Sequence, residues 1–375
     1  MQRDIQHQLS SGVHSRQAHA RLPEGTYEEE YGRDGFFGPA THIYHKHPPT
    51  AWTRIEGPLR PRAFYLDQLA EANPDRRVPV LNNAACTVSM WSVANSMDHL
   101  FRNGDGDELL FVHKGAGQMM TELGRLSFGE GDYLVVPRGI GYQLRLEQPA
   151  TILVVEATGG RFMLPDRGLL GPHAIFDPAM LETPVPEGCQ ATPNSAGEYE
   201  VRVKRGGRLS HVFYPHDPTD IAGWKGDTTV YRLNWRDIRP VVSHRYHVPP
   251  SAHTTFMADR FVVCTFVPRP FESDPDALKV PFFHRNIDFD EFIFLHQGNF
   301  MSRDNARPAM ATLHPAGIHH GPHPKALANQ GKVPMAEEVA VMVDFRDAVD
   351  VSAQSEACEL TEYVNSWQGY LNGKH

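Results

Sequence analysis

The chain has 375 residues, of which 41% are hydrophobic and 22% are charged, and its formal net charge is -9 at pH 7. This composition is typical of a soluble globular protein, and the length suffices for two domains that each bury a core. The acidic balance and the lack of a basic run argue against a nucleic-acid partner. No apolar run approaches the ~18 residues needed to span a membrane, so we expect no membrane partner.

The four cysteines lie far apart and form no CxxC pair. This spacing predicts reduced thiols and argues against a thiolate zinc site. The stretch MQRDIQHQLSSGVHSRQ lacks the apolar core of a secretory signal. We therefore expect a cytoplasmic protein.

Residues 1–60 are polar and are interrupted by Gly and Pro, so we expect an extended arm that packs on the body or on a neighbouring subunit. Short apolar runs closed by Gly, Pro or Asp follow from residue 61, which predicts strands. These runs are FYLDQL, TVSMWSV, ELLFVHKG, YLVVPRG and TILVVEAT. We predict a first β-barrel over residues 61–165, with turns at Gly124 and at residues 129–131.

Residues 166–240 are predicted to form a connecting β-rich segment, in which KRGG is a hairpin turn. The strand pattern returns in residues 241–375 with RFVVCTFVP, EFIFLHQGNF and VAVMVDFRDAV. The stretch MAEEVAVMVDF is dense in β-branched residues and is predicted as a strand rather than a short helix. No long segment has a helical period, so we predict an all-β fold.

One motif skeleton occurs twice, with identical spacing inside each half and an offset of 183 residues (101 to 284 and 108 to 291). The repeat predicts two related jelly-roll barrels. Its glycines are expected in turns: Gly115 and Gly298 would close a hairpin, and each Pro-x-Gly would precede the last position of the motif. The first copy is Phe101-x-Asn103-x4-Glu108-x6-Gly115 with Pro137-x-Gly139-x2-Tyr142, and the second is His284-x-Asn286-x4-Glu291-x6-Gly298 with Pro315-x-Gly317-x2-His320.

Only the second copy has side chains that can hold a metal, namely His284, Glu291 and His320. Two imidazoles and one carboxylate can occupy one face of an octahedral ion and leave three positions free, which favours non-haem Fe(II). A lone His on a strand is usually a satisfied polar group, but the joint spacing favours metal ligands.

The motif spacing also selects among neighbouring residues. The Pro-x-Gly spacing selects His320 over His319, and the Glu-x6-Gly spacing selects Glu291 over Asp290 and Asp288. A one-residue bulge would exchange these choices, because adjacent strand residues face opposite sides.

Four more histidines lie close to the predicted ligands in the sequence. They are either partners that orient the ligands or, for one of them, a donor to dioxygen. His314, six residues before His320, is our preferred candidate for a role near the metal. The four are His296, His314, His319 and His323.

The segments FFHRNIDFDEFIFLHQGNF and TLHPAGIHHGPHP resemble the homogentisate 1,2-dioxygenase family, which carries an HRN segment, a Glu-Phe soon after, and a final HGP. LPEGTYEEEYGRDGFFGPATHIYHKHPPTAW is similar to the N-terminal arm of that family. DELLFVHKGAGQMMTELGRLSFGEGDYLVVPRGIGYQLRL is similar to its first barrel, and YHVPPSAHTTF is similar to the segment with its catalytic His. The likeness runs over nearly the whole chain.

This resemblance implies a cupin-like fold and an Fe(II) cofactor. It also implies an activity that opens a hydroquinone-type ring with both atoms of O2, in tyrosine and phenylalanine degradation. The partners would be a small aromatic diol, O2 and further copies of the chain, as a trimer or a dimer of trimers. By position, His284, Glu291 and His320 match the iron ligands. His247 matches the acid/base His that accepts the proton of the diol, and His314 matches the second pocket His, which would hydrogen-bond to dioxygen.

The chain departs from the family pattern where the family binds the substrate carboxylate. Phe300 stands in place of a Tyr, and Gln297 stands in place of an Arg. The interval from HRN to Glu is also one residue longer. Either another side chain takes over, with Arg285, Arg245 and Asn299 as candidates, or the substrate is a hydroquinone with a different side chain. We therefore assign Phe300, Asn299 and Arg285 to the substrate region.

Three alternatives stay open at this point. The chain could be a non-catalytic metal-binding cupin, a cupin isomerase, or a ring-cleaving dioxygenase for another para-diol. That diol would be gentisate-like or a simple hydroquinone. The intact ligand set favours an altered substrate over a loss of activity.

Overall fold

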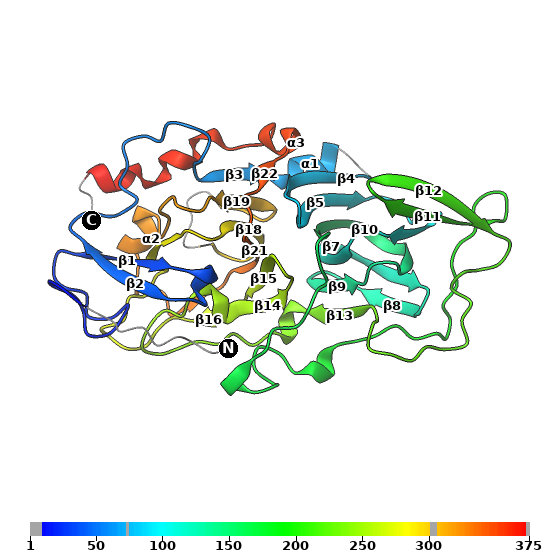
Figure 1. Cartoon of the computed structure of the whole chain (residues 1–375), viewed down its shortest axis with the longest axis horizontal. Coiled ribbons are helices and arrows are strands. Elements are labelled where there is room, and N and C mark those ends of the chain that lie inside the picture. Colours follow the sequence, from blue (N-terminus) through cyan, green and yellow to red (C-terminus); the bar gives the residue numbers. More distant parts are fainter. Residues whose placement is uncertain (1–9, 73–74, 301–305, 373–375) are drawn as a thin grey trace.

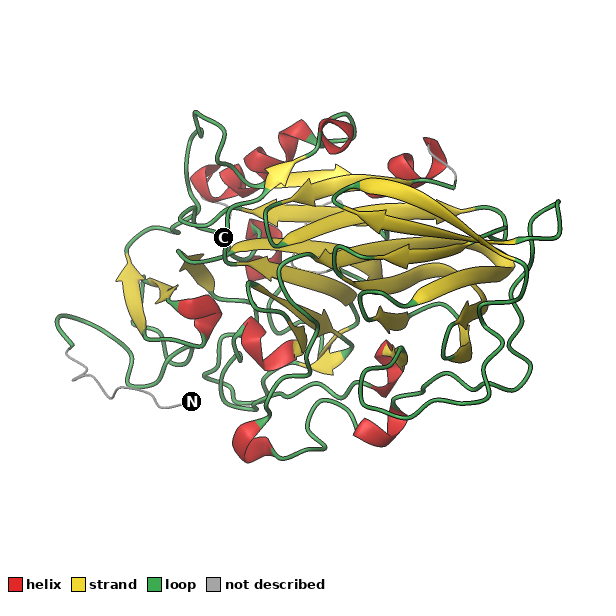
Figure 2. Ribbon diagram, turned by 45° about the vertical axis from the view of Figure 1, so that its right-hand side comes forward, coloured by secondary structure: helices red, strands yellow, loops and turns green. Residues whose placement is uncertain are grey.

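The structure is a computed structural model that describes residues 10–72, 75–300 and 306–372. Strands fill the middle of the molecule and short helices lie at its periphery (Figure 2). The prediction of an all-β fold is confirmed in part, because the chain is mostly β but also contains short helices. None of the helices in the described ranges combines the length and the apolar character that crossing a membrane requires.

The larger sheet is built mainly from residues 77–234 and occupies one half of the molecule (Figure 1). Its longest strands, β7 and β10, pair antiparallel. The predicted turns around Gly124 and residues 129–131 are confirmed, because they join β7 to β8 and β8 to β9. The strands are β4 (Arg77–Asn82), β5 (Cys86–Val93), β6 (Leu100–Asn103), β7 (Asp107–Thr121), β8 (Gly124–Phe128), β9 (Asp132–Val136), β10 (Gly141–Ala157), β11 (Tyr199–Arg205), β12 (Arg208–Tyr214), β13 (Tyr231–Asn234) and β22 (Asp350–Val351).

The smaller sheet has the order β14-β15-β21-β18-β19-β3 and lies in the other half (Figure 1). Strand β21 contains the stretch VAVMVDF, so the prediction of a strand there is confirmed. The strands are β14 (Thr254–Met257), β15 (Phe261–Phe266), β18 (Asp290–Gln297), β19 (Met310–His314), β21 (Val339–Phe345) and β3 (Arg62–Tyr65).

The two halves exchange short strands. Strand β3 comes from the start of the predicted first barrel but pairs with β19 of the second sheet. In return, β22 from the C-terminal part pairs with β4 of the first sheet. The segment predicted as a connection also contributes strands, since the β11–β12 hairpin turns at Gly206 and Gly207, both at positive φ, and β13 pairs with β9.

The N-terminal arm packs on its own chain. Strand β1 (Tyr27–Gly32) pairs antiparallel with β2 (Ala40–His45) and parallel with β17 (Phe283–Asn286). The prediction that the arm packs on the body is confirmed for these strands. A further two-stranded sheet joins β16 (Arg269–Pro270) to β20 (Met335–Ala336).

Helices are short, and one of them corrects a predicted strand. The run FYLDQL divides between β3 and α1 (Leu66–Ala72), because its second half turns into a helix against β5 and β19. The other α-helices are α2 (Pro324–Ala328) and α3 (Ala353–Glu356). The 3-10 helices are η1 (Asp34–Phe36), η2 (Gly168–Leu170), η3 (Pro178–Met180), η4 (Trp235–Asp237), η5 (Pro250–His253) and η6 (Thr361–Asn372).

Gly115 does not close a hairpin, as the spacing had suggested. It lies inside β7 at φ 97, where the register with β10 shifts. A Cβ there would stand 2.5 Å from Pro149 O, so the close approach of β10 requires glycine. Gly298 directly follows β18 at φ 96 and faces Glu337 O in the same way.

One apolar core joins the two sheets. Its largest cluster contains Phe111 of β7 together with Phe294 of β18. Across this contact, the rings of Phe111 and His296 lie 4.9 Å apart and those of His113 and Phe294 lie 5.2 Å apart. Phe294 lies 183 residues after Phe111, and His296 lies 183 residues after His113. The two Phe–His pairs are therefore related by the same offset as the motif copies, and the contact is nearly symmetric.

Candidate metal centre

The smaller sheet and the arm bring His284, Glu291 and His320 together. His284 lies on β17 and Glu291 on β18, while His320 follows the turn after β19. The backbones of His284 and His320 donate to each other's carbonyl at 2.9 and 3.1 Å. Because β17 is also paired with β1, both His-bearing segments are fixed by backbone hydrogen bonds.

The donor atoms of the three side chains point to one place. Glu291 Oε2 lies 3.8 Å from His284 Nε2 and 3.6 Å from His320 Nε2, and the three side chains are buried. The Nδ1 atoms face backbone carbonyls, Phe282 O at 2.9 Å and Ile318 O at 3.2 Å. These contacts fix the tautomer in which each Nε2 lone pair is available to an ion.

A metal ion fits this arrangement. His284 Nε2 is buried and lacks a hydrogen-bond partner within the described part of the chain. A buried polar atom without a partner is costly, and a shared cation would satisfy it. Two imidazoles and one carboxylate are also the donor set of open non-haem Fe(II) sites.

The local charges favour an ionised carboxylate at the centre. Burial would raise the pKa of Glu291, but the imidazoles of His320, His284 and His314 hold it well below its usual range. Burial lowers the pKa of His320, with His284 acting in the same direction. A carboxylate with neutral imidazoles is the protonation state that metal binding requires.

His314 lies behind Glu291. Its Nδ1 is 2.8 Å from Glu291 Oε1, and its Nε2 is 3.1 Å from Tyr363 Oη. Tyr363 belongs to η6, whose Trp367 donates to Gly321 O at 3.3 Å. The C-terminal helix η6 therefore contacts His314 through Tyr363 and lies next to the segment that carries His320.

Asp290 and Asp288, which the motif spacing excluded as ligands, form contacts away from the cluster. Asp290 accepts hydrogen bonds from the backbone of Ala316 and Val349, and Asp288 pairs with Arg33. His319 lies 3.2 Å from Glu29 of β1, on the other side from His320. Strand alternation thus separates the cluster residues from their neighbours.

Two family profiles match the chain. The profile described as homogentisate 1,2-dioxygenase N-terminal matches residues 43–235, and the one described as homogentisate 1,2-dioxygenase C-terminal matches residues 240–374. The chain belongs to the homogentisate 1,2-dioxygenase family. The resemblance read from the motifs is therefore confirmed, and membership supports a ring-cleaving dioxygenase.

Several proteins named as dioxygenases are similar to this chain. A provisionally named dioxygenase from Saccharolobus solfataricus is 31% identical over 362 residues, which cover 91% of this chain and 92% of the relative. Homogentisate 1,2-dioxygenases from Rhodopseudomonas palustris and Bradyrhizobium diazoefficiens are 28% identical over 77% of this chain and 67% of theirs. A solved cupin barrel-domain protein from Leptotrichia buccalis is a distant neighbour, with a TM-score of 0.32 and 8% identity over 76% of this chain and 96% of that chain.

His247, which matches the family's acid/base His, is mostly buried beside Phe282. Its Nδ1 lies 2.9 Å from Glu272 Oε1, and the ring centroids of His247 and Phe282 are 6.3 Å apart. The ring of Phe282 also meets His284, at 5.4 Å. One phenyl ring therefore contacts both the predicted base and a predicted ligand.

The predicted substrate residues lie in three different environments. Phe300 is buried in the apolar cluster that includes Phe283 and Trp367. Asn299 is exposed. Arg285 faces the arm, where its Nε lies 3.3 Å from Glu29 Oε1 and its guanidinium lies 5.0 Å from the ring centre of Tyr31.

A fixed cation that the sequence did not predict lies beside the first motif copy. Arg77 of β4 forms an ion pair with the buried Glu108 and also donates to Tyr142. Tyr142 and Asn103 donate to the same carboxylate at 2.7 and 2.9 Å. Burial would raise the pKa of Glu108, but the charge of Arg77 lowers it. Arg77 lies outside the repeated skeleton, so no spacing pointed to it.

Proposed function

We propose that the chain is an Fe(II)-dependent dioxygenase that opens the ring of homogentisate or a closely related hydroquinone with O2. The observation that carries this proposal is the buried cluster of His284, Glu291 and His320 in a member of this family. When bound there, Fe(II) would lower the pKa of a coordinating phenol and supply the redox chemistry with dioxygen.

His247 is proposed as the base that takes the phenolic proton. Because Glu272 accepts a hydrogen bond from Nδ1, the lone pair of Nε2 is free to receive a proton. Glu272 would also stabilise the imidazolium that results. His247 can later return this proton to the product.

His314 is proposed to act through Glu291 rather than through direct contact with dioxygen. Both of its ring nitrogens have partners, Glu291 on one side and Tyr363 on the other. This arrangement orients the carboxylate, as partners of metal ligands commonly do. His314 is therefore a positioning residue.

One observation favours a hydroquinone whose side chain differs from that of homogentisate. Arg285 neighbours His284 on β17, so the two side chains point to opposite faces, and Arg285 already pairs with Glu29. Phe300 is buried among apolar side chains and Asn299 is exposed. Arg245, the remaining candidate, donates to Gln17 Oε1 of the arm at 3.4 Å. These contacts of Arg285 and Arg245, together with the exposure of Asn299, support a substrate whose side chain differs from that of homogentisate. Residues 301–305 lie outside the described part of the chain.

We also propose that the two halves are duplicated cupin-like barrels. The common offset of 183 residues between Phe111 and Phe294 and between His113 and His296 supports this relation. The oligomer that the family resemblance implies, a trimer or a hexamer, stays a prediction.

Oxygen consumption over a panel of para-diols tests the function. Protein loaded anaerobically with Fe(II) should consume O2 with at least one para-diol, and the panel should pair each carboxylated diol with its uncarboxylated analogue. Faster turnover of the uncarboxylated analogues would support the altered side chain, whereas a strict requirement for the carboxylate would refute it. No oxygen uptake with any para-diol would instead favour the non-catalytic cupin.

A further inference from the structure

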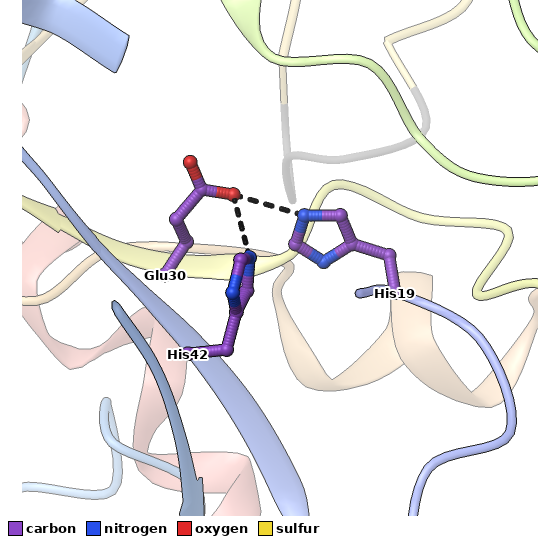
Figure 3. Close-up of side chains that lie close together, drawn as sticks. All are labelled: His19, Glu30 and His42. Atoms are coloured by element: carbon purple, nitrogen blue, oxygen red, sulfur yellow. Dashed lines mark hydrogen bonds and ion pairs between the residues drawn. The ribbon is translucent and has the colours of Figure 1, made fainter. Parts of the chain in front are cut away.

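A second cluster of two imidazoles and a carboxylate lies in the N-terminal arm (Figure 3). Glu30 of β1 points between the ring of His42, on β2, and the ring of His19, which precedes β1. Glu30 Oε2 lies 2.9 Å from His19 Nε2 and 3.3 Å from His42 Nε2. The side chains of His19 and Glu30 are 3% and 9% exposed, so the donor atoms meet in a largely buried place.

The spacing of these atoms suits a shared ion. Ligand atoms that bind one transition-metal ion at ~2.1 Å stand roughly 3 to 3.5 Å from each other. The two contacts of Glu30 lie close to this range. The separations of 3.6 and 3.8 Å at Glu291 are only slightly longer, and the residue types are the same.

The chain also orients His19 from its other side. Glu28 Oε1 lies 2.5 Å from His19 Nδ1, and Tyr44 donates to Glu28 Oε2 at 2.7 Å. A carboxylate that holds one nitrogen of a His fixes the tautomer and leaves the other nitrogen free for a metal. Glu28 and Glu30 alternate with Glu29 along β1, so both face His19 while Glu29 faces His319.

The carboxylates of Glu28 and Glu30 favour a positive charge at this site, whether a proton or a metal ion. Burial, the largest influence, would lower the pKa of His19, yet the hydrogen bonds to Glu28 and Glu30 raise it to about 9. A proton on His19 is therefore the occupant that competes with a metal ion.

We propose that His19, Glu30 and His42 bind a second divalent transition-metal ion, of the Zn²⁺ class, and that Glu28 is the residue that orients His19. Imidazole and carboxylate are suitable donors for such an ion, and no thiolate is needed. This inference does not depend on the proposed ring-opening activity.

A metal ion at this site would hold the arm next to the cluster of His284, Glu291 and His320. The ring of Phe282 stacks on His19, with ring centroids 4.2 Å apart, and meets His284 at 5.4 Å. An ion bound by His19 would tie the segment before β1 to the β1–β2 hairpin, which is paired with the strand of His284. The arm would then be held in place by metal as well as by backbone hydrogen bonds.

Equilibrium dialysis against Zn²⁺ tests the proposal. The metal-stripped full chain is dialysed at neutral pH, and bound zinc per chain is measured by elemental analysis. We expect two ions in the wild type, one in Glu30→Gln and His42→Ala, and one in His284→Ala. Glu28→Gln should weaken one of the two sites by about 10- to 100-fold, as loss of an orienting partner does.

His45→Ala provides the matched control. His45 also lies on β2, but it bonds to Glu29 at 2.6 Å rather than to Glu30, so this variant should retain both ions. Glu30→Gln preserves the shape of the side chain. If His42→Ala disrupts the fold of the arm, the zinc content of Glu30→Gln still tests the proposal. A single ion in the wild type, lost only in His284→Ala, would overturn the proposal in favour of a protonated His19. Two ions in both Glu30→Gln and His42→Ala would overturn it as well.

Discussion

A buried carboxylate needs a neighbouring positive charge, and the two motif copies meet this need differently. In the first copy Arg77 pairs with Glu108 and lies 4.5 and 4.6 Å from the ring centres of Trp91 and Phe101. In the second copy Glu291 faces imidazoles that leave donor atoms for an ion. The spacing of the motif was enough to predict that His284, Glu291 and His320 lie close together. Arg77 could not be predicted, because it comes from a strand outside the repeat.

Replacing Arg77 tests the role of this fixed cation. Arg77→Met leaves Glu108 buried without its charge partner and should lower the free energy of unfolding by about 3 to 5 kcal/mol. The double variant Arg77→Met/Glu108→Gln removes both charges and should recover most of this loss. Denaturant unfolding measures both values. Equal stability of Arg77→Met and the wild type would contradict the role of Arg77 as the charge partner of Glu108.

His247→Ala tests the proposed base. This variant should retain its iron, because His247 is not a ligand, but should turn over about 100- to 10,000-fold more slowly. Iron content and oxygen uptake are measured on the same preparation. Glu272→Gln should shift the pH dependence of the turnover rate. Replacement of a residue with only a structural role would not shift it. An unchanged rate in His247→Ala would exclude this role.

At the scale of elements, the sequence predicted strands well and their partners poorly. Alternation and turn residues located the hairpins at Gly124 and Gly206, because these signals are local. The exchange of β3 and β22 between the sheets was not predictable, since each is short and its pairing is decided by distant residues. The arm cluster was missed for the same reason: His19 and Glu30 lie on separate segments.

The contact between β7 and β18 contains a buried histidine pair, His113 and His296, whose Nδ1 atoms lie 2.9 Å apart. Burial lowers the pKa of His113 to about 3 and that of His296 to about 4, with smaller contributions from charged neighbours. In the unfolded chain both would titrate near 6.5. The unfolded state therefore binds more protons below this pH, and stability should fall as the pH drops from about 6.5 to about 4.

The double variant His113→Gln/His296→Gln should lose this part of the pH dependence. Each histidine contributes up to ~1.4 kcal/mol per pH unit, so the wild type should have the steeper slope of unfolding free energy between about pH 6 and pH 4.5. The exposed His173→Gln is the control and should keep the wild-type slope. Parallel slopes in the wild type and the double variant would refute the role of the pair.

At the scale of the whole molecule, the two sheets are not independent bodies. They exchange strands, and one apolar cluster contains residues of both, including Phe111 and Phe294. Domains that could separate have few contacts across their boundary, which is not the case here. The larger sheet, which contains Arg77 and Glu108, therefore packs against the smaller sheet, which contains the candidate metal centre, and the two are expected to stabilise each other.

If His284, Glu291 and His320 form the site at which a hydroquinone ring is opened, both atoms of O2 should enter the product there. The most direct measurement is a single turnover under ¹⁸O₂, with iron-loaded wild type and iron-loaded Glu291→Gln compared by mass spectrometry of the product. The wild type should give a ring-opened product that carries both labelled oxygen atoms, and Glu291→Gln should give none. A product without both labels, or equal turnover by the two proteins, would contradict this role of the three residues.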